Sequence, residues 1–82
     1  MKILKFSASW CGPCKMLSTT IAGIKDKIPY PIEEIDADTN SKLAQKFNIR
    51  GLPTMIIMDG DTEVKRKVGS MSLNELKTFV GI

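Results

Sequence analysis

Short apolar runs alternate along this chain with segments of helical periodicity, and that alternation limits the possible folds more than any other feature. Ile3–Phe6 is a short, mostly apolar run typical of a central strand, and residues 11–28 carry apolar side chains three and four positions apart, which predicts one buried helix face. Pro29 and Pro31 end this helix. A second strand over Ile32–Ile35 completes a strand, helix, strand unit, whose right-handed crossover predicts a parallel strand pair.

The middle of the chain predicts a short helix followed by a hairpin. Asp38–Ser41 is a cluster of residues that favour the N-cap of a helix. The apolar side of that helix consists of Leu43, Ala44 and Phe47. Asp59-Gly60 separates two β-type runs, Thr54–Met58 and Thr62–Val68. This pattern predicts an antiparallel hairpin with a type I′ turn, in which both central residues need a positive φ.

The last predicted element is a helix that begins at a capping box formed by Ser72 and Glu75. Its buried stripe is predicted to consist of Leu73, Leu76, Phe79 and Val80. The element order is therefore β-α-β-α-β-β-α. We expect a single domain over residues 1–82, with a four-stranded mixed sheet and helices on both faces, which is a three-layer α/β/α fold.

The composition excludes several classes of function. The 82 residues include no histidine, which excludes imidazole general bases, His-ligated zinc and Ser-His or Cys-His nucleophile pairs. Twelve basic and nine acidic residues give a net charge of +3, and the basic residues are scattered, so we expect no nucleic acid as a partner. A chain of this size also has too small a core to enclose a large cofactor.

The start of the chain lacks the pattern of an export signal. Met1–Phe6 is interrupted by charge and is followed directly by the cysteines, whereas a secretory segment needs an uninterrupted apolar stretch. No segment reaches the length of a membrane span, so we expect no membrane partner. We expect a cytoplasmic location, a reducing compartment in which a Cys-x-x-Cys pair is typically catalytic or metal-binding.

The two cysteines, Cys11 and Cys14, lie where the first strand gives way to the first helix, which is where α/β sheets present their binding crevice. Cys11 is predicted at the helix N-terminus, where free N–H groups and the helix dipole lower a thiol pKa from its usual value of about 8.5. Cys14 lies on the inward stripe and is expected to be the more buried sulfur. Pro13 stiffens the first helical turn. One thiol is therefore placed to attack and the other to resolve.

Two other interpretations of the cysteine pair are open. A zinc half-site would need two further ligands, and without histidine or a third cysteine these would be carboxylates or groups of a second chain. An inert pair of core cysteines is the second alternative, but Trp10-Cys11-Gly12-Pro13 is a loop-like sequence and a poor place to bury a thiol. Thiol chemistry is the favoured interpretation.

The sequence Trp10-Cys11-Gly12-Pro13-Cys14-Lys15, followed by Ile49–Thr54, the Asp59-Gly60 hairpin and Val68-Gly69, resembles thioredoxin along the whole chain. The first strand and helix of that family are absent, so the resemblance is to a minimal thioredoxin of phage or prokaryotic type. It implies a protein-disulfide reductase with a redox-active Cys11–Cys14 disulfide and no bound cofactor. It also implies a monomeric electron carrier that is recharged by an NADPH-dependent thioredoxin reductase and reduces protein disulfides.

The resemblance further implies a substrate-binding rim beside the cysteines. In the family, the proline that matches Pro53 has a cis peptide bond and faces the cysteines, and the backbone of the residue that matches Leu52 pairs with an extended substrate. Taken singly, Leu52 and Val68 also fit plain core positions. The residues implied to form a flat apolar rim are Trp10, Gly12, Pro13, Leu52, Pro53, Val68 and Gly69.

The chain departs from the family pattern at a charged pair. Thioredoxins usually carry a buried aspartate on the first strand of this unit and a lysine on the next strand, whereas this chain has Lys5 and Glu34 at those places. We hypothesise that Glu34 serves as general base for the buried thiol, with Lys5 as its ion-pair partner. The alternative is that both side chains reach solvent. Ser7 also replaces a family tryptophan that supports the active-site loop.

Two competing functions follow from other features of the chain. Its short length also suits a glutaredoxin-like protein that is recharged by glutathione, but such proteins usually carry Cys-Pro-Tyr-Cys and a Gly-Gly-x-Asp start to the last helix. Gly69–Ser72 provides neither the second glycine nor the acid. A non-catalytic subunit of a larger enzyme would use the apolar rim without the sulfurs. Cys11→Ser separates the reductase from the non-catalytic subunit, because the reductase loses turnover and the subunit keeps its complex.

Overall fold

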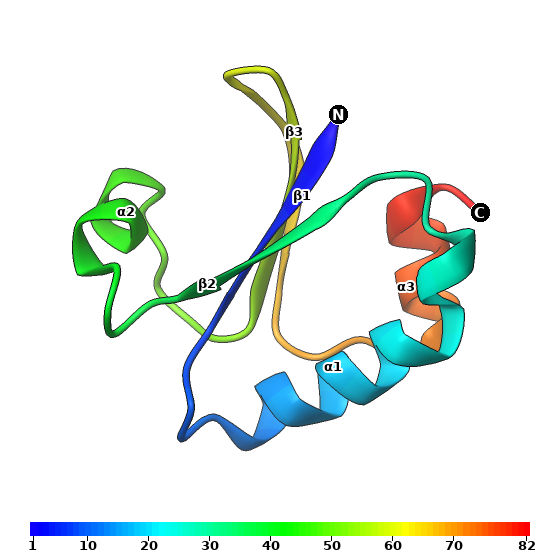
Figure 1. Ribbon diagram of the computed structural model, residues 1–82, viewed down its shortest axis with the longest axis horizontal. Coiled ribbons are helices and arrows are strands. Elements are labelled where there is room, and N and C mark those ends of the chain that lie inside the picture. The colour runs from blue at the N-terminus through cyan, green and yellow to red at the C-terminus, as the bar shows by residue number, and fades with distance from the viewer.

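Four strands form one mixed sheet in the computed structural model, which describes residues 1–82 (Figure 1). The sheet order is β2-β1-β3-β4. β1 pairs in parallel with β2 and antiparallel with β3, and β3 pairs antiparallel with β4. The sheet is therefore mixed and β1 is central, as the sequence predicts. The strands are β1 (Lys2–Ser7), β2 (Ile32–Asp36), β3 (Thr54–Asp59) and β4 (Thr62–Val68).

The helices lie on both faces of this sheet. α1 (Gly12–Ile24) and α3 (Leu73–Val80) cover one face, and α2 (Ser41–Lys46) covers the other (Figure 1). Ten buried residues form the core under α1 and α3, and five form the core under α2. These layers confirm the predicted α/β/α fold and its element order.

Alternation along β1 explains why its residues serve both cores. Ile3 belongs to the core under α1 and α3, and Leu4 and Phe6 belong to the core under α2. Successive side chains of a strand point to opposite faces, so Lys5 faces α1 together with Ile3. The central strand therefore places a charged side chain under α1, one of whose ends carries the cysteines.

The first helix ends earlier than its periodicity suggests. α1 stops at Ile24, and a 3₁₀ turn over Lys25–Lys27 follows, so the predicted extension to residue 28 is wrong. Ile28 lies outside the helix but still packs, partly buried, against the core. The 3₁₀ turn tightens the last turn ahead of Pro29, and it keeps an apolar residue facing inward although the helix has ended.

The hairpin forms at the predicted place but with a different turn. Asp59 pairs with Thr62, so the two central residues are Gly60 and Asp61, and only Gly60 has a positive φ, at 60°. This pattern matches a type II′ turn, which needs glycine at its first central position, and the predicted type I′ turn is wrong. The one-residue shift arises because Asp59 completes the ladder of β3 instead of entering the turn.

The capping box that begins α3 is confirmed. Glu75 N–H donates to Ser72 Oγ at 3.2 Å, and the Glu75 carboxylate accepts from Ser72 N–H at 3.0 Å. Leu73, however, is 44% exposed, so its predicted place in the buried stripe is wrong. Leu73 is the first residue of the helix and lies beyond the edge of the core. Periodicity assigns a residue to a helix face but does not say how far along the axis the core extends.

Candidate active site

The two cysteines form a disulfide at the start of α1, with their Cα atoms 5.3 Å apart. Cys11 is the N-cap residue of the helix, and its Sγ accepts a hydrogen bond from Cys14 N–H at 3.2 Å. Cys11 is 4% exposed and Cys14 is 3% exposed, so in the disulfide form the expected difference in burial between the two sulfurs is absent. Both sulfurs are buried alike because the short loop holds them in one cluster with Ala8.

The first turn of α1 favours negative charge on Cys11. Free N–H groups at a helix N-terminus carry a partial positive charge, and one of them, that of Cys14, already points at Cys11 Sγ. No acidic residue lies in this turn to oppose the effect. Gly12 and Pro13 are exposed there, so an incoming disulfide can approach the turn from solvent.

A loop with a cis peptide bond packs beside the disulfide. The bond between Leu52 and Pro53 is cis, as the family resemblance implies, and Pro53 is buried. Leu52 packs against the cluster that contains both cysteines. Gly69 N–H donates to the Pro53 carbonyl at 2.7 Å, and Gly69 has a φ of 95°, a conformation that side chains disfavour. Residue 69 therefore links the end of β4 to the cis-proline loop.

The other predicted rim residues differ in exposure. Trp10 is 68% exposed and Val68 is 53% exposed, so neither is a plain core residue, whereas Leu52 is half-buried. Gly51 lies against Val68, because a Cβ at residue 51 would meet Val68 Cγ1 at 3.0 Å. The Leu52 N–H and carbonyl groups make no hydrogen bond within the protein. The backbone N–H and carbonyl groups of Leu52 therefore lie free beside exposed apolar side chains.

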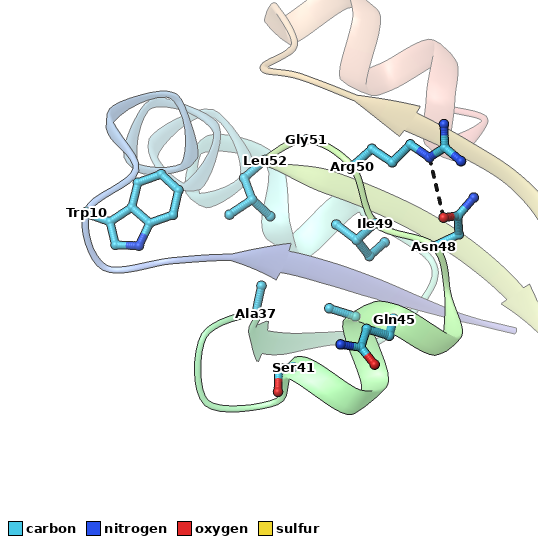
Figure 2. Close-up of a pocket in the computed structure, with 10 residues that line it drawn as sticks. Trp10, Ala37, Ser41, Gln45, Asn48, Ile49, Arg50, Gly51 and Leu52 are labelled. Atoms are coloured by element: carbon cyan, nitrogen blue, oxygen red, sulfur yellow. Dashed lines mark hydrogen bonds between the residues drawn. The ribbon is translucent and has the colours of Figure 1, made fainter.

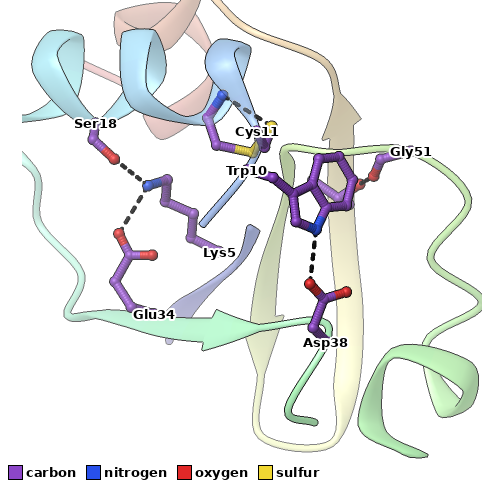
Figure 3. The surroundings of a disulfide bond; sticks show 9 residues. Lys5, Trp10, Cys11, Ser18, Glu34, Asp38 and Gly51 are labelled. Atoms are coloured by element: carbon purple, nitrogen blue, oxygen red, sulfur yellow. Dashed lines mark hydrogen bonds and ion pairs between the residues drawn. A yellow bond between two sulfur atoms is a disulfide. The ribbon is translucent and has the colours of Figure 1, made fainter. Parts of the chain in front are cut away.

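Asp38 is a site residue that the sequence analysis missed. Trp10 Nε1 donates to Asp38 Oδ2 at 2.7 Å, which holds the exposed indole ring beside the disulfide (Figure 3). Asp38 lies in the cluster that the sequence analysis interpreted only as a helix start. No spacing rule connects two residues that are 28 positions apart, so only the fold could bring them together.

A groove runs from the rim along α2. It has a volume of about 580 Å³, and Arg50 is its only charged residue. Figure 2 shows Trp10 and Leu52 at one end of the groove and Asn48 and Arg50 at the other. The groove thus continues the exposed apolar surface away from the disulfide. Its lining residues are Trp10, Ala37, Ser41, Ala44, Gln45, Asn48, Ile49, Arg50, Gly51 and Leu52.

The charged pair expected under the cysteines does form. Lys5 Nζ lies 2.8 Å from Glu34 Oε1 and also donates to Ser18 Oγ (Figure 3). The Lys5 side chain is 2% exposed, and the Glu34 side chain is 59% exposed. The lysine is therefore the desolvated member of the pair. Ser18 was missed by the sequence analysis, although its place four residues after Cys14 sets both on one side of α1.

Neither a metal cluster nor a membrane helix accompanies this site. No group of three or more His, Cys, Asp or Glu residues lies close enough together to hold a metal ion. None of the helices has the length and apolar character needed to cross a membrane.

The fold and the site together define a small α/β protein with a dithiol/disulfide redox centre. The thioredoxin family model matches residues 1–81, and the chain belongs to the thioredoxin family.

Individual relatives agree with this assignment. The chain is 38% identical to thioredoxin C-3 of Corynebacterium nephridii over 89% of its own length and 51% of the relative. It is 37% identical to thioredoxin of Chlamydia muridarum over 95% of its own length and 78% of that relative. It is also 37% identical to a bifunctional thioredoxin reductase/thioredoxin of Mycobacterium leprae over 83% of this chain and 15% of that protein. It therefore spans about half of the first relative and three quarters of the second.

A solved structure gives the same result for the fold. Thioredoxin-2, described as a component of malaria parasite protein secretion machinery, superposes with a TM-score of 0.87 and 32% sequence identity, covering 96% of this chain and 79% of that one. Family membership and the Cys11–Cys14 disulfide support thiol-disulfide oxidoreductase activity of the protein-disulfide reductase type. They do not favour the glutathione-dependent or the non-catalytic alternative.

Proposed function

We propose that this chain reduces disulfides in other proteins, with Cys11 as the nucleophile and Cys14 as the resolving thiol. The observation that carries the proposal is the place of Cys11 at the N-cap of α1, where Cys14 N–H donates to its Sγ at 3.2 Å. This hydrogen bond and the helix dipole stabilise a thiolate on Cys11 once the disulfide is reduced. A thiolate is the form of cysteine that attacks disulfides.

The exchange has two steps. The Cys11 thiolate attacks one sulfur of a substrate disulfide, which forms a mixed disulfide and releases the other substrate sulfur as a thiolate that takes up a proton. Cys14 then loses its proton and attacks Cys11 Sγ, which breaks the mixed disulfide and forms the Cys11–Cys14 bond. Two electrons pass to the substrate, which leaves as a dithiol, and the protein ends oxidised.

The rim is the proposed substrate-binding surface. Its residues are Trp10, Gly12, Pro13, Leu52, Pro53, Val68 and Gly69. The free Leu52 N–H and carbonyl groups support pairing with an extended substrate segment, since unpaired backbone groups at an edge add a strand readily. Exposed Trp10 and Val68 would then contact side chains of that segment.

The proposed recharging partner is an NADPH-dependent thioredoxin reductase. The Mycobacterium leprae relative, whose name places a reductase and a thioredoxin in one chain, supports this partner. We place the protein in the cytoplasm as an electron carrier in redox homeostasis, because a dithiol that works as a reductant needs a reducing compartment. Residues 1–82 would act as one domain and a monomer. Charged residues on the edge strands, Glu33 and Glu34 on β2 and Lys65 and Lys67 on β4, support this by opposing the pairing of two β2 edges or of two β4 edges.

The hypothesis that Glu34 is the general base for Cys14 stays a prediction. Its contact with Lys5 supports a place near the site, and its exposure leaves it without the desolvation on which the hypothesis depends. The pH dependence of substrate reduction, compared between the native chain and Glu34→Gln, tests it. Identical profiles would remove Glu34 from the proton transfer.

The experiment that tests the function is reduction of a protein disulfide, such as that of insulin, driven by NADPH and thioredoxin reductase. A parallel reaction driven by glutathione and its reductase tests the glutaredoxin-like alternative. We expect turnover in the first reaction and little in the second. Absence of turnover in both would overturn the proposal and favour a binding role.

Two matched variants assign the sulfurs, because each removes one thiol and both prevent the internal disulfide. Cys14→Ser should accumulate a mixed disulfide with the substrate through Cys11, and Cys11→Ser should accumulate none. Mass spectrometry of the trapped species distinguishes them. The reverse pattern would exchange the proposed roles of the two cysteines.

A further inference from the structure

Lys5 is the one charged residue that the fold buries, at 1% exposure. It stands in the middle of the central strand, next to Glu34 of β2 and Met55 of β3 in the sheet register. Burying an ammonium group is costly unless it is paired and hydrogen-bonded, and a lysine in a central strand could be replaced by an apolar residue. The presence of a buried lysine at this position therefore needs a reason that depends on its positive charge.

The ammonium is held in place from two elements. Glu34 Oε1 accepts from Lys5 Nζ at 2.8 Å on the β2 side, and Ser18 Oγ accepts from it on the α1 side (Figure 3). The neighbour on β3, Met55, is neutral. Lys25 lines the same small cavity as Ser18 and Glu34 but bonds to neither. Glu34 is thus the only charged group bonded to the ammonium, and it lies mostly in solvent.

The same contacts place the ammonium beneath α1, the helix that begins at the disulfide. Ser18 follows Cys14 by four residues, which is about 6 Å along a helix axis, and residues four apart lie on one side of a helix. Figure 3 shows the Lys5 side chain pointing from β1 toward the first turns of α1, on the side of the sheet where the disulfide lies. A buried positive charge is therefore bonded to a residue that lies one helical turn beyond Cys14.

We propose that the Lys5 ammonium sets the reduction potential of the Cys11–Cys14 pair by stabilising the negative charge that reduction leaves on sulfur. A reducing dithiol gives two electrons to the disulfide, the S–S bond breaks, and the donor becomes a disulfide. The protein keeps one of the two released protons as a thiol, and its other sulfur is a thiolate. The disulfide is neutral and the reduced pair is an anion, so a nearby cation favours the reduced form. This inference rests on the proposed redox function of the site.

Solvent exposure decides the net sign of the effect. The carboxylate of Glu34 opposes the ammonium, but water screens a charge that is 59% exposed more strongly than one that is 2% exposed. The field that reaches the sulfurs through the protein is therefore that of the lysine. Lys5 does not touch the reacting atoms, so it is a positioning residue for charge and not a catalytic residue.

A second lysine–glutamate pair on the same two strands provides a matched control. Lys2 and Glu33 lie 3.5 Å apart, and their side chains are 50% and 55% exposed. Lys2→Met and Lys5→Met therefore make the same chemical change in the same strand, one in solvent and one beneath α1. Glu34 remains solvated in the second variant, and exchanging a buried charge for an apolar residue of similar size is well tolerated.

The experiment measures two quantities on the full chain: the equilibrium with a glutathione redox buffer, and the pH titration of the thiolate by ultraviolet absorbance. We expect Lys5→Met to shift the equilibrium about tenfold toward the disulfide, which is about 30 mV for a two-electron couple, and to raise the midpoint of the thiolate titration. Glu34→Gln should shift both in the opposite direction by about threefold. Lys2→Met and the charge-conserving Lys5→Arg should stay within about twofold of the native chain.

The inference would be overturned if Lys5→Met and Lys2→Met gave the same equilibrium, or if Lys5→Met and Glu34→Gln shifted it in the same direction. A change in unfolding free energy alone, with the potential unchanged, would also overturn it, because it would assign Lys5 a purely structural role. Insulin reduction tests the proposed function separately. Failure of that assay leaves the potential measurable, so the two proposals fail independently.

Discussion

The two faces of the sheet are built differently, although the same four strands supply both. The face under α1 and α3 has a core of ten buried residues, including three from each helix. The face under α2 has five, all from strands, and α2 adds only the half-buried Leu43, Ala44 and Phe47. The heavily packed face holds the cysteine helix in place, and the thinly packed face leaves the groove open beside the rim. One side of the sheet therefore fixes the helix that carries the cysteines, and the other side leaves the groove beside the rim accessible.

The ends of the helices show the same contrast. α3 begins at the capping box of Ser72 and Glu75 and ends at Gly81, whose φ of 82° and N–H bonds to α3 carbonyls are typical of a left-handed cap. No side chain caps the N-terminus of α2, and the carbonyl of its C-cap residue, Phe47, accepts from Arg66 of β4 at 2.9 Å. The ends of α3 are capped by residues adjacent in sequence, whereas the C-terminal end of α2 is hydrogen-bonded to a residue 19 positions from Phe47.

The largest expected difference between the faces is in core truncation. Leu17→Ala removes a fully buried side chain from the core under α1 and α3, and we expect it to lower the free energy of unfolding by about 3 kcal/mol. Leu43→Ala removes the same atoms from a half-buried position on α2, and we expect a loss of about 1 kcal/mol. Urea denaturation of the two variants provides the comparison. Equal losses would show that the faces contribute alike.

The next effect tests the tie between β4 and α2. Arg66→Met removes the donor to the Phe47 carbonyl and the pair with Glu63, and we expect a loss of about 1.5 kcal/mol. Amide hydrogen exchange should rise in α2 and not in α3. Lys42→Met, at an exposed position on α2, is the control. Uniform exchange changes over both helices would contradict the view that Arg66 serves α2.

Loss of the N-cap side chain should lower the free energy of unfolding more at α3 than at α2, by up to about 1 kcal/mol. Ser72→Ala removes the side-chain acceptor for Glu75 N–H, and we expect it to cost about that much in urea denaturation. Asn40→Ala, at the N-cap of α2, removes a side chain that accepts from no helix N–H and makes only exposed bonds to Asp36 and Thr39, and we expect less than about 0.5 kcal/mol. An equal cost at both caps would mean that the local bond at Ser72 contributes little.

The smallest expected effect is a pH dependence shared by the two faces. Hydrogen bonds from Ser72 lower the pKa of Glu75 below its usual value of 4.5, and the side-chain hydrogen bond from Arg66 lowers that of Glu63. A lowered pKa in the folded state means that stability is present above the unfolded-state value and is lost as the pH falls through the folded-state value.

Stability should therefore decrease below about pH 4.5. Glu75→Gln and Glu63→Gln should each reduce stability at pH 7 and have almost no effect at pH 2. Urea midpoints at both pH values give the measurement. A loss of the same size at both would show that neither carboxylate charge contributes. Comparing the two variants also tells which face is more sensitive to acid.

Much of this architecture could be predicted from local sequence. Helical spacing identified the buried stripe of α1, the capping box identified α3, and Asp59-Gly60 located the hairpin. The errors lie where local pattern and tertiary packing compete. The turn shifted by one residue because Asp59 extended a strand pair, and Leu73 became exposed because the core ends before it.

The site residues also fall into two groups, those that local sequence places and those that only the tertiary structure places. The sequence alone determined that Cys11 and Cys14 stand at a helix start, because strand, loop and helix follow one another within a few residues, and short-range geometry fixes that arrangement. Only the tertiary structure decided that Asp38 holds Trp10 and that Lys5, not Glu34, is the desolvated member of its pair. Burial depends on which strand is central and which lies at an edge, and pairing of distant segments settles that order.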